Sequence, residues 1–190
     1  MPRSHRSRVV AAALALGLAA ALAGCDSGAG TAPSPSQPSM PPPDEPIFAS
    51  DEEALAAAED AYAAYAAASA AVGADGGVGV ERLRDLVDVE LYKQSVEEFR
   101  QFEEMGLSSE GTSIIRNAAL ADHRALNDQV LISAYLCRDV SNVRVLDRTG
   151  DDVTPADRQD RQSLLVSFKG TRGHLVISQI EPWKDQTPCE

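Results

Sequence analysis

Few residues of this chain stand at spacings that are typical of catalysis. The sequence contains no Gly-x-Ser-x-Gly elbow, no phosphate-binding loop and no His-Glu-x-x-His pair. His123 and His174 lie far apart in the sequence, and a lone histidine is more often a surface residue than a metal ligand. The segment 147–152 is rich in aspartate, but its glycine is misplaced for a calcium loop and Arg158 stands where a closing glutamate is needed. We therefore expect no metal and no cofactor.

Cys25 is the residue with the clearest chemical role. It follows Leu22-Ala23-Gly24 at the end of an apolar run, and that run follows a short basic start with no acidic residue. The run is shorter than the roughly 20 residues that span a bilayer, which is typical of an export signal. Residues 22–25 resemble the lipobox of bacterial lipoproteins, in which the chain is cut before a cysteine that is then acylated. An ordinary signal peptide or a short membrane anchor is the alternative.

The resemblance to a lipobox implies a signal peptide at residues 1–24 and a mature protein that begins at Cys25. Acyl chains on Cys25 would hold that protein to the outer face of the cell membrane, outside the cytoplasm. Residues 25–49 are rich in proline, serine, glycine and alanine, a composition that favours extended conformations and cannot bury a core. We expect this segment to be a tether that holds a single domain, residues 50–190, away from the bilayer.

Cys137 and Cys189 remain once Cys25 is lipidated. Outside the cytoplasm an even number of thiols favours pairing, and no Cys-x-x-Cys motif indicates redox catalysis. We expect Cys137 late in a strand and Cys189 in the tail, so a disulfide would pin the tail onto the sheet. The alternative is two unrelated thiols with Cys137 simply buried.

The charge of the chain limits the partners it can take. Lysine and arginine total 17 against 29 acidic residues, which gives a formal net charge of −12. A strongly acidic surface argues against nucleic acid and against anionic lipid headgroups as partners. The expected partners are the membrane, through the lipid anchor, and an unknown protein or small molecule.

Helices are expected first and strands afterwards. Ser50 and Glu53 form a capping box before an alanine-rich helix, and the glycines of 73–79 end it. A second helical stretch carries Leu83, and a third ends at Gly106. The helical core stripe is expected to comprise Leu55, Tyr62, Leu83, Val96, Phe99 and Phe102.

Strand signals follow at 112–120, 129–140, 143–146, 163–169 and 174–183, with a hairpin loop at 170–173. This order predicts an α+β fold with an antiparallel sheet. Alternate residues should share a face, so we expect Leu164, Val166 and Phe168 to be buried, as well as Leu175 and Ile177. Trp183 continues that second series and is expected to pack over the disulfide.

Three amino-terminal helices, turns at Gly106 and Gly111, and a strand meander resemble the nuclear transport factor 2-like (SnoaL-like) fold. The carboxy-terminal part is similar to small actinobacterial lipoproteins of that class, at 130–140, 143–145, Gly150, 164–168, 175–178, Trp183 and Cys189. The resemblance implies three helices packed on a curved antiparallel sheet of four to five strands, which together form a cone.

Enzymes of that superfamily place a tyrosine and a carboxylate inside the cone. Such a pair could act as a hydrogen-bond donor and a general base. The candidate carboxylates are Asp139 and Glu181, and the candidate pocket residues here are Tyr62, Tyr65, Tyr92, Phe99 and Tyr135.

Two functions remain open at this point. The sequence favours a non-catalytic domain that binds a ligand or a protein, and the alternative is a small hydrolase or isomerase that uses the cone pocket. An apolar pocket with a few convergent polar groups would favour a ligand, whereas a filled interior with an exposed sheet face would favour a protein partner.

Overall fold

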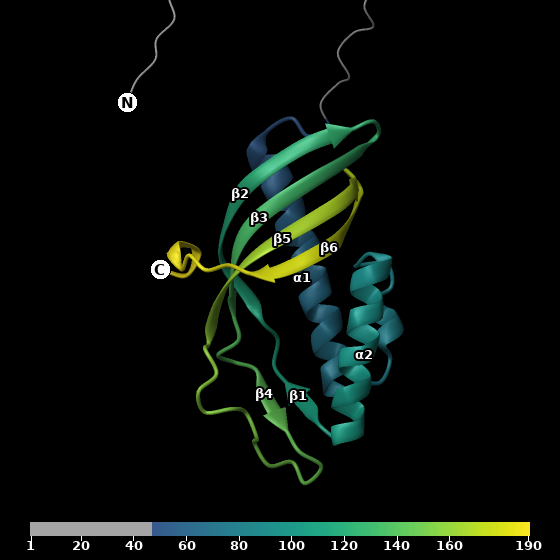
Figure 1. The fold of residues 1–190 in the computed structure, drawn as a ribbon, viewed down its shortest axis with the longest axis vertical. Coiled ribbons are helices and arrows are strands. Elements are labelled where there is room, and N and C mark those ends of the chain that lie inside the picture. The colour runs from purple at the N-terminus through teal and green to yellow at the C-terminus, as the bar shows by residue number, and fades with distance from the viewer. Residues whose placement is uncertain (1–46) are drawn as a thin grey trace, which may run out of the picture. The chain divides into compact units, whose positions relative to one another are not determined.

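The computed structural model describes residues 47–190, and Cys25 with most of the expected tether lies outside them. The α-helices α1 (Asp51–Ala74) and α2 (Val89–Met105) lie beside a twisted sheet (Figure 1). Short 3-10 helices, η1 (Val80–Leu83) and η2 (Thr187–Cys189), precede α2 and end the chain. The strands are β1 (Ser108–Glu110), β2 (Ile114–Leu126), β3 (Gln129–Asp139), β4 (Arg144–Leu146), β5 (Arg161–Thr171) and β6 (His174–Pro182).

The main sheet has four antiparallel strands in the order β2-β3-β5-β6. Strands β1 and β4 form a separate antiparallel ribbon below it (Figure 1). Side chains alternate along β3 and β5, so Ile132, Leu136, Val166 and Phe168 point to one face and are buried there. We call this covered side the inner face and the opposite side the outer face. The expected burial of Leu164, Leu175 and Ile177 is also confirmed.

Helix α1 covers the inner face. Ser50 Oγ accepts a hydrogen bond from Glu53 N–H at 3.2 Å, and Glu53 Oε2 accepts one from Ala49 N–H at 2.7 Å, so the expected capping interaction forms. The residues of the helix that pack most closely on the core recur every four positions and are mostly small: Ala54, Ala58, Tyr62 and Ala66. Short alanine side chains let the helix lie close to the sheet, and Leu55 and Tyr65 flank this stripe half-buried.

The expected cover of three amino-terminal helices is wrong. Between Gly79 and Asp88 the chain makes only the η1 helix, a turn over 84–86 and a single bridge residue, Val87. Val87 pairs in parallel with Ile177, Ile177 N–H donates to Leu86 O at 2.9 Å, and Asp88 N–H donates to Ile177 O at 2.8 Å. The edge of β6 therefore satisfies the backbone groups that a second helix would have paired internally. Two α-helices accompany the sheet in residues 47–190, so the arrangement expected from the nuclear transport factor 2-like resemblance is not found.

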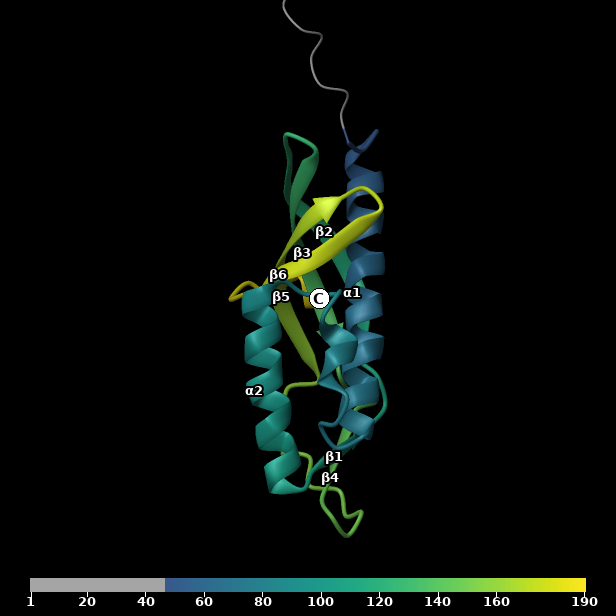
Figure 2. The ribbon, with the colours of Figure 1, turned by 90° about the vertical axis from the view of Figure 1, so that its right-hand side faces the viewer.

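Helix α2 is also packed less tightly than its apolar spacing predicts. Asp88 caps its start by accepting from Leu91 N–H at 2.9 Å, and Gly106 ends it with a positive φ of 68°. Ser95 is the buried residue of this helix, whereas Val96 is 37% exposed and Phe99 and Phe102 are half-buried. Figure 2 shows α2 standing apart from α1 rather than lying on the sheet. The expected core stripe therefore holds for Tyr62 and Leu83, holds in part for Leu55 and Phe99, which pack half-buried against the core, and fails for Val96.

The packed domain begins slightly before the expected boundary at residue 50. Phe48 is 3% exposed and belongs to the hydrophobic core, and Ile47 packs against it. No helix in residues 47–190 combines the length and the apolar character that are needed to cross a bilayer.

Candidate functional site

A cavity of about 350 Å³ lies between the second half of α1, helix α2, the β1–β4 ribbon and the adjoining ends of β3 and β5. We call it the inner cavity. This volume is at the lower end of the range for small-molecule sites, roughly 300–1,000 Å³. Its apolar wall comprises Ala66, Ala70, Phe99, Phe102, Val140, Val143 and Val145, and its polar groups come from Ser69, Ser109, Ser113, Arg138, Arg158 and Gln162.

The helices shape the apolar wall of the inner cavity. The rings of Phe99 and Phe102 meet edge to face with centroids 6.5 Å apart, and they close the α2 side. On the opposite side, Gly73 brings α1 close to β1, where a Cβ at this position would lie 2.3 Å from Ser109 Oγ. The incomplete packing of α2 therefore leaves a space between elements rather than a filled core.

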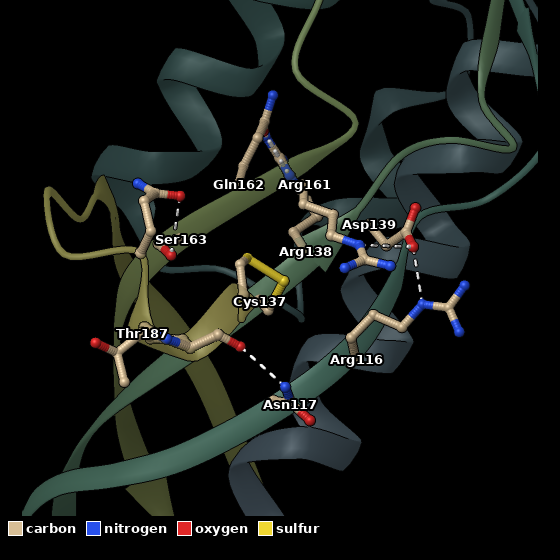
Figure 3. Close-up of a disulfide and its surroundings, with 12 residues drawn as sticks. Arg116, Asn117, Cys137, Arg138, Asp139, Arg161, Gln162, Ser163 and Thr187 are labelled. Carbon is tan, nitrogen blue, oxygen red and sulfur yellow. Dashed lines mark hydrogen bonds and ion pairs between the residues drawn. A yellow bond between two sulfur atoms is a disulfide. The ribbon is translucent and has the colours of Figure 1, made fainter.

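Arg138 is the cation on the inner face of β3. It continues the series of buried inward positions 130, 132, 134 and 136, so the strand delivers its side chain to the inner cavity. The guanidinium donates from Nε to Gln162 Oε1 at 3.1 Å, and Nη2 contacts the same oxygen (Figure 3). Among residues 47–190 it makes no ion pair with a carboxylate. The cavity thus holds a half-buried positive charge without a counter-ion from the described chain.

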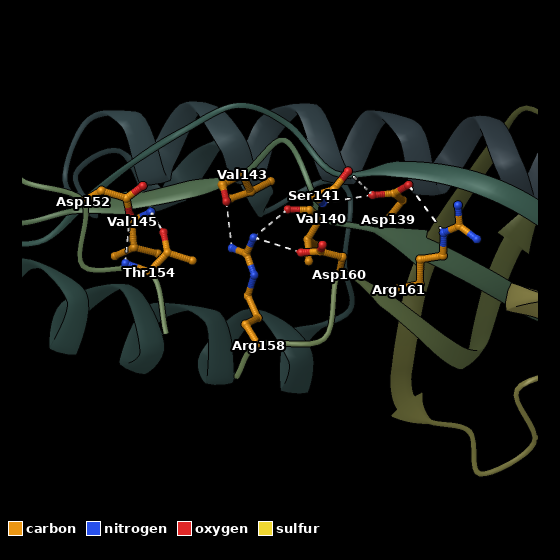
Figure 4. Close-up of polar contacts among 10 residues, drawn as sticks. All are labelled: Asp139, Val140, Ser141, Val143, Val145, Asp152, Thr154, Arg158, Asp160 and Arg161. Atoms are coloured by element: carbon orange, nitrogen blue, oxygen red, sulfur yellow. Dashed lines mark hydrogen bonds and ion pairs between the residues drawn. The ribbon is translucent and has the colours of Figure 1, made fainter. Parts of the chain in front are cut away.

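Arg158 places a second guanidinium at the same cavity and also organises its loop wall. Nη1 donates to Val143 O at 2.7 Å, and Nη2 donates to Val140 O at 3.0 Å and lies 3.5 Å from Asp160 Oδ1 (Figure 4). These bonds fix the turn between β3 and β4. Its Nε is buried and has no hydrogen-bond partner among the residues described, and the same is true of Ser69 Oγ on α1. Both atoms are shielded from solvent, so they contribute to the wall of the cavity and not to its open surface.

Two of the expected pocket tyrosines lie beside this site. Tyr62 and Tyr65 pack with ring centroids 5.9 Å apart. Burial raises the pKa of both phenols above the ordinary value, while the nearby Arg138 charge opposes that increase. Tyr62 is 1% exposed and belongs to the core, so its main role is packing. Neutral phenols near Arg138 supply hydrogen-bonding groups but no negative charge.

The other expected pocket residues divide between the cavity and remote positions. Phe99 lines the inner cavity as expected. Tyr92 instead packs under Arg84, whose Cζ lies 4.7 Å from the ring centroid, and its hydroxyl accepts from Arg84 Nη2 at 3.1 Å. Tyr135 lies on the outer face, where it contacts Trp183. Of the expected pocket residues, Phe99 therefore lines the inner cavity, Tyr62 and Tyr65 lie close to its Arg138, and Tyr92 and Tyr135 make their contacts elsewhere.

Neither candidate carboxylate stands in the inner cavity. Asp139 follows Arg138 on β3, and its carboxylate accepts from Ser141 N–H at 2.9 Å and Ser141 Oγ at 2.6 Å, and from Arg116 Nε at 2.8 Å (Figures 3 and 4). The hydrogen bonds from Ser141, followed by that from Arg116, hold the pKa of Asp139 far below its ordinary range, so it is a poor general base. Glu181 is exposed near the end of β6.

The expected disulfide is confirmed. Cys137 and Cys189 are bonded, with their α-carbons 4.9 Å apart, and Asn117 Nδ2 donates to Pro188 O at 3.1 Å (Figure 3). These two links fix the tail onto the outer face of β3 and β2. Cys137 is buried in spite of its outward position, because the tail covers it.

The face of the sheet on which Trp183 lies differs from the expectation. A bulge between Ser167 and Phe168 shifts the register, so Phe168 pairs with Ile177 but Ser167 pairs with Gln179. The extra residue on β6 exchanges the faces of all later residues. Trp183 thereby reaches the outer face and packs on Tyr135, with ring centroids 4.9 Å apart.

Sequence reasoning missed Arg138 and Arg158. The signal for Arg138 was present, since an arginine occupied the inward position of an otherwise apolar strand series. Arg158 carried no comparable signal, because it lies in the long connection between β4 and β5. Residues 47–190 contain no group of three or more histidine, cysteine, aspartate or glutamate side chains placed to hold a metal ion.

The inner cavity can hold a small molecule with an apolar body and an anionic group. The phenylalanine, alanine and valine side chains supply an apolar wall, and Arg138 supplies a guanidinium that has no carboxylate partner within the described residues. Guanidinium groups bind carboxylate and phosphate through paired N–H donors.

No protein-family model matches the chain, and no curated protein matches it. Among solved structures, the chain is similar to the crystal structure of the intermembrane space region of the chloroplast protein ARC6. The two are 12% identical, the TM-score is 0.50, and the match covers 69% of this chain and 97% of that chain. At this level of identity the likeness concerns the fold alone.

Proposed function

We propose that this chain is a secreted lipoprotein of the type found in actinobacteria, anchored through Cys25 to the outer face of the cell membrane. Its folded domain binds a small apolar anion in the inner cavity and does not catalyse a reaction. The sequence of residues 1–25 supports the anchor, and the disulfide between Cys137 and Cys189 is consistent with a location outside the cytoplasm.

The single observation that carries the binding function is Arg138 in its cavity. Arg138 lies on an inner strand face beside an apolar wall, and no carboxylate in residues 47–190 pairs with its positive charge. An anionic ligand would supply the missing counter-charge. Arg158 adds a second guanidinium to the lining of the same cavity.

The open interior favours a ligand over a protein partner as the occupant of this site. A filled interior would have left the sheet face or helix α2 as the main surface for recognition, but here a cavity separates α1 from α2. The alternative of a small hydrolase or isomerase has less support, because Asp139 is held by Ser141 and Arg116, and Glu181 is exposed near the end of β6. Neither supplies a general base at the cavity.

A matched pair of ligands tests the proposal. Octanoate and octanol share an apolar chain and differ in the carboxylate, so isothermal titration of the purified protein should show octanoate binding more tightly. Cys25→Ser protein is used so that no acyl chain of its own competes. The proposal is contradicted if the two ligands bind equally or if neither binds.

The variant Arg138→Gln should weaken octanoate binding about tenfold or more, because a hydrogen bond to a charged group contributes roughly 1.5–3 kcal/mol. It should leave octanol binding unchanged. Arg124→Gln is the matched control, since Arg124 is an exposed arginine of β2 that does not line the inner cavity. Equal loss in both variants would show a general effect of net charge instead of a specific contact.

A further inference from the structure

A second cavity, of about 450 Å³, lies on the outer face of the sheet beside the carboxy-terminal tail. We call it the tail groove. Its aromatic side chains are Tyr135 and Trp183, and its polar side chains are Asn117, Asp185 and Thr187. None of these residues lines the inner cavity, so the two sites are separate.

The tail groove is a fixed feature of the fold. The bulge in β6 turns Trp183 to the outer face, where its ring packs against Tyr135 at an interplanar angle of 44°. Trp183 is still 36% exposed, so part of its ring is open to a ligand. The disulfide and the Asn117–Pro188 hydrogen bond hold the tail that forms the other wall (Figure 3). The groove therefore presents an aromatic surface at little cost in conformational entropy.

The charged side chain that lines the groove is a carboxylate. Asp185 is the charged side chain among its lining residues, and no lysine or arginine is among them. Thr187 donates to Asp185 Oδ1 from its N–H at 3.0 Å and from its hydroxyl at 2.7 Å, which orients the carboxylate. Asp185 Oδ2 makes no hydrogen bond within residues 47–190. Arg116, next to the lining residue Asn117, is engaged by Asp139, and Lys184, between Trp183 and Asp185 in the chain, is exposed and does not line the groove.

We propose that the tail groove binds an organic ammonium cation, such as a trimethylammonium group. A cation over the face of a tryptophan is attracted by the quadrupole of the ring, and the attraction grows when the site is partly desolvated. Asp185 adds a fixed negative charge beside the aromatic pair, and the net charge of −12 attracts cations to the whole molecule. A neutral sugar would use the aromatic surface but would gain nothing from this charge.

Trp183 is the single tryptophan of the chain, so its fluorescence reports directly on the groove. The full chain is titrated with choline and with 3,3-dimethyl-1-butanol, which has the same shape without the charge. We expect a saturable change with choline and at least about tenfold weaker binding of the neutral alcohol, because the charge supplies the attraction. Vesicles of phosphatidylcholine form a second arm: a matching change assigns the cation to a lipid headgroup, and a change with free choline alone assigns it to a soluble molecule.

Asp185→Asn tests the carboxylate and should weaken choline binding about fivefold, the size expected for a partly exposed ion pair. Asp157→Asn is the control, because it removes the same charge from an exposed loop outside the groove. Trp183→Leu, followed by saturation transfer to the choline methyl protons, should abolish binding. The proposal is overturned by equal binding of choline and its neutral isostere, by absence of a saturable signal, or by saturation with N-acetylglucosamine but not with choline.

Discussion

Arg138 and Asp139 are neighbours on β3 whose side chains leave opposite faces of the sheet. Asp139 is satisfied, since Ser141 and Arg116 donate to it and Arg161 lies 3.9 Å away. Arg138 is not, since its described partners are neutral. One strand thus carries a structural charge on one side and a charge free for recognition on the other. For this reason we assign ligand recognition to Arg138 and a structural role to Asp139.

The acid stability of the domain should depend on Asp139. Its pKa is lowered in the folded protein, so as pH falls below about 4 the unfolded chain takes up the proton first. The stability that this group contributes is complete above that pH and is lost as pH falls toward the folded-state pKa. Asp139→Asn should therefore lower the free energy of unfolding at pH 7.

The difference between wild type and Asp139→Asn should shrink steadily below about pH 4, as measured by urea denaturation across a pH series. Asp122→Asn is the control, because Asp122 is exposed and its ion-pair distance to Arg124 is 3.9 Å. A difference between wild type and Asp139→Asn that stays constant from pH 7 to pH 2 would refute the role given to the Asp139 carboxylate.

At the scale of elements, the close packing of α1 depends on its alanine stripe. Ala58 is fully buried against the sheet, so Ala58→Leu would insert three extra carbon atoms into a closed contact. We expect a loss of about 1–3 kcal/mol in the free energy of unfolding, measured by denaturant titration. Ala56→Leu on the exposed side of the same helix should cost under about 0.5 kcal/mol. Equal effects at both positions would mean that α1 does not pack on the sheet as described.

Strands and capping residues could be predicted because their signals are local. The alternation of Leu164, Val166 and Phe168 indicated the buried face directly, and Ser50 marked the start of α1. The conformation of segment 80–88 could not be predicted from its own residues, since its partner is the edge of β6, far away in the sequence. The bulge beside Phe168 likewise carried no sequence signal, so the face of Trp183 was misassigned.

The inner cavity could be predicted only in part, because some of its residues follow local patterns and others depend on contacts between distant segments. Phe99 was expected in a pocket and lines this cavity, whereas Tyr62 and Tyr65 lie close to its Arg138 but do not line it. Its charge came from Arg138, which a strict alternation rule would have placed inward, and from Arg158, whose position depends on a long connection. The loose packing of α2 that opens the cavity was not visible in its apolar spacing, which predicts a buried stripe.

We propose that a lipid anchor at Cys25 holds the whole binding domain at the membrane. Cys25→Ser should release the protein from the membrane fraction or leave the uncut precursor, because thioether acylation requires the thiol. Fractionation of the producing cells, with mass spectrometry of the amino terminus, measures both outcomes. Ser27→Ala provides a control that leaves the cysteine in place. Normal membrane retention of the Cys25→Ser protein would remove the lipoprotein proposal.

The two cavities lie on separate parts of the domain and carry opposite charge. Arg138 and Arg158 make the inner cavity positive, whereas Asp185 makes the tail groove negative. An apolar anion and an organic cation should therefore bind at different places on the same protein, and failure of one site would leave the other untouched.

The most direct measurement is a two-dimensional amide and side-chain NMR titration of the purified Cys25→Ser protein with octanoate. The account predicts saturable shifts at residues that line the inner cavity, above all Ser69, Phe99, Phe102 and the Arg138 and Arg158 guanidinium groups. Resonances of Tyr135 and Trp183 should stay in place. Shifts confined to the tail groove, or spread evenly over the domain without saturation, would contradict the assignment of the inner cavity as the anion-binding site.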